Sequence, residues 1–166
     1  MEQLDTTATS DNSEKLDNFD RNLYLTFHLN GENYGLAIHY VTEIIGIQAI
    51  TSVPSMPESI KGIINLRGRV IPVMDVRLRF GFPERSYDER TCIIVVHVPD
   101  QTIGLIVDRV EEVVNIPPEQ IESAPEGWRE QTVIDGMGKI NDQVKILLDV
   151  GPLVSTLPQV MDFAVE

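Results

Sequence analysis

Cysteine is almost absent from this chain of 166 residues, because Cys92 is the only one. A disulfide within the chain is therefore excluded, and so is a zinc site built from several thiolates. Long hydrophobic runs are also missing, since no apolar stretch approaches the ~20 residues that span a bilayer. The polar, acidic start of the chain lacks the features of a signal peptide. These absences predict a soluble protein of the cytoplasm without membrane insertion.

Positive charge is scarce as well. Thirteen Lys and Arg residues stand against 26 Asp and Glu residues, which gives a net charge of −13. A field of this sign repels phosphate backbones and anionic membrane surfaces. Nucleic acid is therefore excluded as an expected partner, and the plain reason for the acidity is solubility.

The first 21 residues have few apolar side chains and carry six acidic ones. Such a segment cannot bury enough apolar surface to offset its ordering entropy. Residues 1–21 are therefore predicted to be a disordered acidic tail, and the folded part is predicted to begin near Leu23.

Strand patterns dominate the rest of the chain. Residues 23–29 alternate between apolar and polar side chains, as in a half-buried strand, and the hairpin signal Asn30-Gly31 follows. Further strands are predicted at residues 34–38 and 41–47. Two more, at residues 60–66 and 70–76, flank a turn at Arg67-Gly68.

The same pattern then repeats. A shift of 69 residues aligns Gly35 with Gly104, Val41 with Val110, and Glu43 with Glu112. A shift of 74 residues aligns Gly62 with Gly136, Val70 with Val144, and Asp75 with Asp149. Order and turn positions are both kept, so the chain is predicted to contain two copies of a five-stranded unit.

Each unit of about 60 residues would have a marginal core alone. Closure of each sheet into a small barrel would remove exposed edges, and packing of two barrels would add burial. The predicted fold is therefore all-β, with two pseudo-symmetric five-stranded barrels packed together and short helical segments. The predicted subdomains are residues 22–82 and 91–154, within one domain at 22–157. A groove between them is the natural place for a partner.

One motif lies in the segment Gly62-Ile63-Ile64-Asn65-Leu66-Arg67-Gly68 and the following residues 70–76. It resembles the "KG..NLRG...P..D" signature of the CheW family of chemotaxis coupling proteins. Three shorter matches lie at residues 41–45 ("V.EI"), 103–108 ("G..VD") and 121–126 ("I..AP"). Together the matches extend from about Tyr24 to Leu153.

This resemblance implies two SH3-like barrels and a non-catalytic adaptor without cofactors. It implies two partners, the cytoplasmic tips of chemoreceptors and the regulatory domain of the histidine kinase CheA, with other CheW-like domains as further neighbours in an array. The protein would be cytoplasmic and recruited to membrane receptor clusters. A stand-alone coupler is expected, because the chain has no kinase motifs and only 13 residues after Leu153.

Seven residues are predicted to bind the receptor. Arg67 lies at a hairpin tip, and its planar guanidinium suits bidentate recognition of carboxylates and carbonyls. Glu43 matches the family glutamate of "V.EI", although an edge-strand charge that blocks aggregation would explain it equally well. Gly62 is expected to act through the backbone. The predicted receptor-binding residues are Val41, Glu43, Ile44, Gly62, Asn65, Arg67 and Val113.

Three residues are predicted to contact the kinase: Ile38, Glu122 and Trp128. The family meets the kinase near the loop that contains Trp128, and tryptophan is a frequent hot-spot residue. The alternative is that Trp128 is partly buried in the core.

Two other functions are compatible with parts of the sequence. Asp75 and Asp149, one per repeat, could form an aspartic protease dyad, but neither precedes the Thr/Ser-Gly of those enzymes. The expected role of these two residues is to cap the short segments that follow. Neither a phosphate-binding loop nor a histidine constellation for a metal is found. The second alternative is an accessory or competing CheW-like scaffold in another receptor–kinase pathway.

Overall fold

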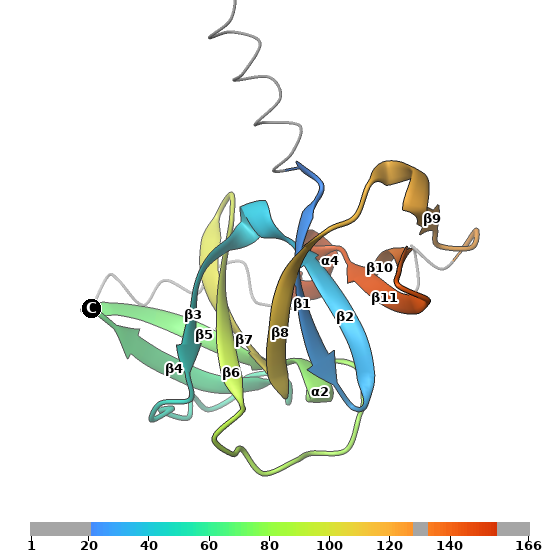
Figure 1. Ribbon diagram of the computed structural model, residues 1–166. Coiled ribbons are helices and arrows are strands. Elements are labelled where there is room, and N and C mark those ends of the chain that lie inside the picture. Colours follow the sequence, from blue (N-terminus) through green and yellow to red (C-terminus); the bar gives the residue numbers. More distant parts are fainter. Residues whose placement is uncertain (1–20, 128–132, 156–166) are drawn as a thin grey trace, which may run out of the picture.

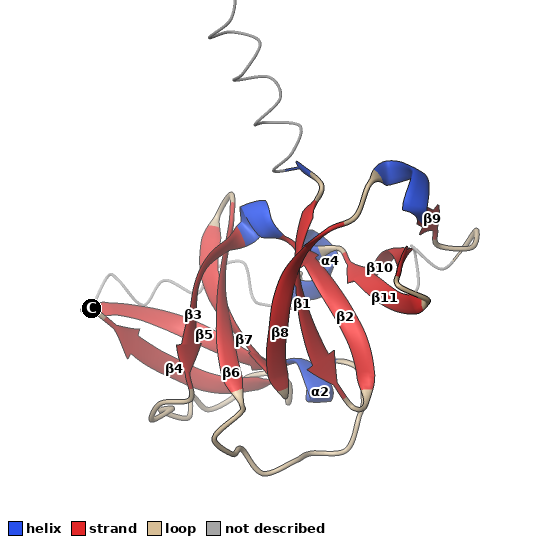
Figure 2. Ribbon diagram, in the orientation of Figure 1, coloured by secondary structure: helices blue, strands red, loops and turns tan. Residues whose placement is uncertain are grey.

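Strands make up more than half of the residues that the computed structural model describes, which are 21–127 and 133–155 (Figures 1 and 2). Residues 1–20 of the predicted tail therefore lie outside the described residues. No helix of the described ranges is long and apolar enough to cross a membrane. The elements are β1 (Leu23–Leu29), β2 (Glu32–Ala37), η1 (Ile38–Tyr40), β3 (Val41–Gly46), β4 (Ile60–Leu66), β5 (Arg69–Asp75), α2 (Val76–Arg79), β6 (Cys92–Val98), β7 (Gln101–Val107), β8 (Arg109–Asn115), η2 (Pro118–Gln120), β9 (Ile121–Ser123), β10 (Ile134–Ile140), β11 (Gln143–Leu148) and α4 (Val150–Val154).

The hairpin turns have the backbone that their sequences predicted. Asn30 and Gly31, between β1 and β2, have φ angles of 53° and 82°. Arg67 and Gly68, between β4 and β5, have φ angles of 53° and 84°. Two successive positive φ angles are the mark of the type I′ turn, whose twist matches that of the flanking strands. The turn at Arg67-Gly68 therefore determines where the arginine side chain emerges.

The strands form two sheets, and each sheet contains strands from both halves of the chain (Figure 1). One sheet has the order β8-β1-β2-β11-β10-β9, and the other has the order β3-β6-β7-β5-β4. The predicted subdomain boundaries, 22–82 and 91–154, therefore do not coincide with the two sheets. The repeat predicts two consecutive barrels, one from each half of the chain. In the structure, the first two strands of each half belong to the sheet of the other half.

The exchange follows the internal repeat. Strands β1 and β2 lie between β8 and β11, while β6 and β7 lie between β3 and β5. Two strand pairs are parallel. The pair β2–β11 places Gly35 beside Leu147, and the pair β5–β7 places Gly104 beside Val73. A Cβ atom on Gly35 would come within 2.9 Å of Leu147, and one on Gly104 within 2.9 Å of Val73. The matched glycines of the repeat thus allow close packing of the two parallel strand pairs.

The larger hydrophobic core joins the two sheets. Its buried members include Leu25 and Phe27 on β1 and Ile94 and Leu105 on β6 and β7. A smaller cluster lies within the second sheet and contains Ile64, Ile71, Val73, Ile93, Val95 and Ile106. The fold class is therefore confirmed: all-β, with two SH3-like units packed together and, in the described part of the chain, two short α-helices.

A polar clasp also connects the sheets. The carboxylate of Asp108, between β7 and β8, accepts hydrogen bonds from the Arg77 guanidinium at 2.6 Å and from the Asn30 backbone N–H at 3.0 Å. Arg77 also donates to the Asn30 side-chain oxygen at 3.2 Å. The side chains of Arg77 and Asp108 are each only 11% exposed. This clasp holds α2, the β1–β2 hairpin and the β7–β8 connection together.

Candidate functional site

Arg67 and Glu43 form a bidentate ion pair on the surface. Both guanidinium nitrogens Nη1 and Nη2 donate to the two carboxylate oxygens of Glu43 at 2.8 Å. The β4–β5 hairpin tip is thereby fastened to the edge strand β3. The side chain of Arg67 is 74% exposed and that of Glu43 is 26% exposed. The arginine is therefore held in one orientation while most of its surface still faces solvent.

The hydrogen bonds from Arg67 hold the pKa of the Glu43 carboxyl below its usual value. A lowered pKa in the folded state means that the stabilisation is present above the unfolded pKa. It is lost as the pH falls through the folded pKa. Arg67→Ala should therefore raise the pKa of Glu43 toward its ordinary value. Carboxyl titration by NMR measures this shift, and an unchanged Glu43 titration in the variant would show that the pair does not persist in solution.

Asn65 and Gly62 shape the backbone of the β4–β5 hairpin. The Asn65 side-chain oxygen accepts a hydrogen bond from the Gly68 N–H at 2.9 Å, which closes the turn. Gly62 is buried, and a Cβ atom there would lie 2.0 Å from the Thr51 carbonyl oxygen. Gly62 cannot offer a side chain to a partner, so any part it has in binding is indirect, through the backbone.

The apolar residues of the predicted site are divided between the two sheets. Ile44 is 43% exposed on β3, after the half-buried Val41 at the start of that strand. Val113 is 50% exposed on β8, which is an edge strand of the other sheet. The structure thus brings Glu43 and Arg67 together, while the grouping of Val113 with them in one groove stays a prediction.

Two exposed aliphatic residues were missed. Val70 on β5 is 43% exposed and Val144 on β11 is 50% exposed. They are repeat mates, as are Ile44 and Val113, so each sheet displays an equivalent pair of apolar side chains. The 74-residue shift already aligned Val70 with Val144 and was the signal that could have identified them.

The residues predicted to contact the kinase lie on different elements. Ile38 is in η1, half-buried against the larger core. Glu122 is exposed on β9 and accepts a hydrogen bond from Lys139 at 2.8 Å. Trp128 lies outside the described residues. The grouping of these three residues on one surface therefore stays a prediction.

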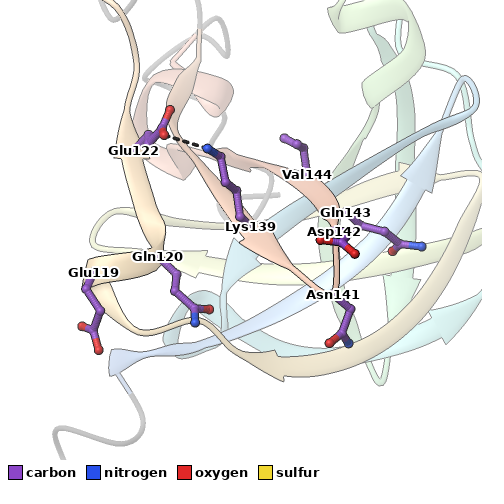
Figure 3. A pocket seen from close by; sticks show the side chains of 8 residues that line it. All are labelled: Glu119, Gln120, Glu122, Lys139, Asn141, Asp142, Gln143 and Val144. Carbon is purple, nitrogen blue, oxygen red and sulfur yellow. Dashed lines mark hydrogen bonds and ion pairs between the residues drawn. The ribbon is translucent and has the colours of Figure 1, made fainter.

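Glu122 and Lys139 also line an open cavity of about 650 Å³. Figure 3 shows their ion pair on one side and the β10–β11 tip, Asn141 and Asp142, on the other. This tip is the repeat mate of Arg67-Gly68 but has no arginine. The two sheets therefore present hairpin tips of different charge at equivalent places.

Asp75 and Asp149, the two aspartates of the protease alternative, each directly precede a short helix. Asp75 is buried and accepts hydrogen bonds from the Arg77 and Leu78 N–H groups and from the Tyr87 hydroxyl. It caps α2 as predicted. Asp149 occupies the equivalent position before α4 but makes no capping hydrogen bond, so that half of the prediction is wrong. Within residues 21–127 and 133–155, no group of three or more His, Cys, Asp or Glu could hold a metal ion.

Comparisons with known proteins agree on one family. The family described as "CheW-like domain" matches residues 23–157. The chemotaxis protein CheW of Klebsiella aerogenes is 36% identical over 135 residues, which cover 80% of this chain and 81% of the relative. That of Bacillus subtilis is 39% identical over 108 residues, covering 65% and 69%.

A solved structure is also similar. The crystal structure of the scaffolding protein TtCheW from Thermoanaerobacter tengcongensis matches with a TM-score of 0.72 and 39% identity. The match covers 77% of this chain and 88% of that one. The extent of the family match and these identities show that this chain belongs to the CheW family.

Proposed function

We propose that this protein is a non-catalytic chemotaxis adaptor, which couples the cytoplasmic tips of chemoreceptors to the histidine kinase CheA. Its family membership supports this proposal, as do relatives named chemotaxis proteins and a scaffolding protein. The protein acts in the cytoplasm, at receptor clusters on the membrane, beside other CheW-like domains.

The observation that carries the proposal is the exposed, bidentate Arg67–Glu43 pair. Glu43 holds the guanidinium in one geometry, so less side-chain entropy is lost when a partner binds. The remaining N–H groups of Arg67 are directed to carbonyls or carboxylates of a receptor helix. Ile44 adds exposed apolar surface on the same strand as Glu43.

Arg67→Ala should weaken receptor binding by roughly tenfold or more, the effect typical of losing an interface arginine. The fold should persist because the side chain is mostly exposed. Co-sedimentation with receptor fragments measures affinity, and circular dichroism tests folding. The matched control is Arg69→Ala, an exposed arginine at the start of the next strand of the same hairpin. Equal affinities of the Arg67→Ala variant and the parent would remove Arg67 from the receptor site.

The kinase requires a separate surface, because a coupler holds both partners at once. We assign it to Ile38, Glu122 and Trp128, near strand ends where loops vary over a rigid scaffold. Trp128→Ala should impair assembly that depends on the kinase and leave binding to an isolated receptor tip intact, while Arg67→Ala should do the reverse. Loss of both activities in Trp128→Ala, or loss of its fold, would contradict this division.

A further inference from the structure

An aromatic cavity of about 330 Å³ lies away from the Arg67–Glu43 pair. Its aromatic wall is a chain of ring contacts, with the Tyr34 and Phe80 ring centroids 5.8 Å apart and those of Phe80 and Phe82 also 5.8 Å apart. The remaining apolar lining is aliphatic and comes from β10, β11 and Val133, the residue before β10. The cavity is lined by Tyr34, Arg79, Phe80, Phe82, Val133, Ile134, Ile146 and Leu148. Its volume falls within the range of ordinary ligand sites.

Arg79 supplies the one positive charge in this lining. Its guanidinium donates to the backbone carbonyls of Leu153 at 3.1 Å and Pro152 at 3.3 Å, in the last turn of α4. No carboxylate among residues 21–127 and 133–155 forms an ion pair with it. The cavity thus combines an apolar interior with a cation whose charge no carboxylate of the described residues compensates, which suits an apolar, acidic peptide.

The same contacts place the end of α4 beside the cavity. The chain continues from Ser155 into residues 156–166, which lie outside the described ranges. In that segment Met161, Phe163 and Val165 alternate with other residues, so an extended backbone would put them on one face. Asp162 and Glu166 add negative charge. Eight residues from Ser155 to Phe163 reach up to about 27 Å when extended, which gives ample length for a return to the cavity.

We propose that residues 156–166 dock in this aromatic cavity, with Phe163 against the rings and the acidic side chains near Arg79. Docking buries apolar side chains of the segment and lining surface that would otherwise remain in water. The occupant is a segment of the same chain, because it begins three residues after Leu153, whose carbonyl contacts Arg79, and because it carries both apolar and acidic side chains.

The test is hydrogen–deuterium exchange on the full-length chain. Phe163→Ser should speed amide exchange in residues 79–82 and 133–148 on the order of tenfold, because the docked segment is released. The control Thr156→Ala, a polar position of the same segment in the opposite phase to Met161, Phe163 and Val165, should leave exchange unchanged. Exchange on β3 and β4, which contribute no lining residue to the cavity, should be unaffected in both variants.

Three results would overturn the proposal. The first is unchanged exchange at residues 79–82 and 133–148 in Phe163→Ser. The second is protection that rises with protein concentration, because a second copy would then supply the segment. The third is a response to Trp128→Ser in place of Phe163→Ser, since the occupant would then be the 128–132 segment.

Discussion

Gly62→Ala should lower the melting temperature of the protein by about 6–12 °C, equivalent to a loss of roughly 3 kcal/mol or more. Gly62 has a φ of 149°, which residues with a Cβ atom rarely adopt. A Cβ atom would also lie 2.0 Å from the Thr51 carbonyl oxygen. That carbonyl accepts a hydrogen bond from the Ile63 N–H at 2.9 Å, so it cannot retreat without breaking the bridge to β4. Differential scanning calorimetry measures the change.

Gly46→Ala is the matched control. Gly46 ends the edge strand β3, and a Cβ atom there would meet nothing within 4 Å. The expected change in unfolding free energy is within about 0.5 kcal/mol. Equal stabilities of Gly62→Ala and Gly46→Ala would contradict the assignment of Gly62 to close backbone packing. Reduced receptor binding by Gly62→Ala should accordingly follow the loss of structure at the hairpin.

Asp108→Ala should destabilise the protein by about 3 kcal/mol, because it leaves the nearly buried Arg77 guanidinium without its carboxylate. The same change removes the acceptor of the Asn30 N–H. Two connections between the sheets are therefore lost together. Urea unfolding measures the effect, read from the shift of the midpoint at constant slope.

Arg85→Ala tests the same carboxylate from its exposed side. Arg85 lies 3.5 Å from Asp108, but its side chain is 53% exposed. An exposed pair of this kind contributes between zero and about 1 kcal/mol. A larger loss in Arg85→Ala than in Asp108→Ala would show that the clasp depends on the outer arginine and not on Arg77.

The local part of the fold was predictable because its signals are local. Alternation along residues 23–29 and the Asn30-Gly31 turn each concern neighbours in sequence. The structure confirms the strand and the turn, although Thr26 on the polar side of the strand is buried too and donates to the Glu112 carbonyl on β8. The pairing of strands was not predictable in this way, because β2 pairs with β11 and β5 pairs with β7 across long stretches of chain. The repeat revealed two equivalent units, but hydrophobic periodicity contains nothing that distinguishes consecutive barrels from exchanged ones.

The site was predictable as separate residues and not as a unit. Glu43 and Arg67 were each identified, yet no sequence signal showed that one would hold the other. Lys145 was missed altogether: it is 3% exposed within β11 and is paired with Glu111 on β8 at 3.3 Å. A lysine in an apolar run is read as a surface position, and only the long-range partner explains its burial.

The exchanged strands have a consequence for how the molecule loses its structure. Each sheet is completed by the other half of the chain, so neither can melt while its counterpart stays intact, and denaturation should follow a single cooperative transition. Most strand pairs that join one half of the chain to the other also bring together residues that are far apart in sequence. Folding should therefore be slower than for a chain of two independent barrels. An isolated half would lack the strands that complete its sheets and would have to obtain them from a second copy, as in a domain-swapped dimer. The intact chain is thus built like such a dimer with its two copies fused through the loop between α2 and β6.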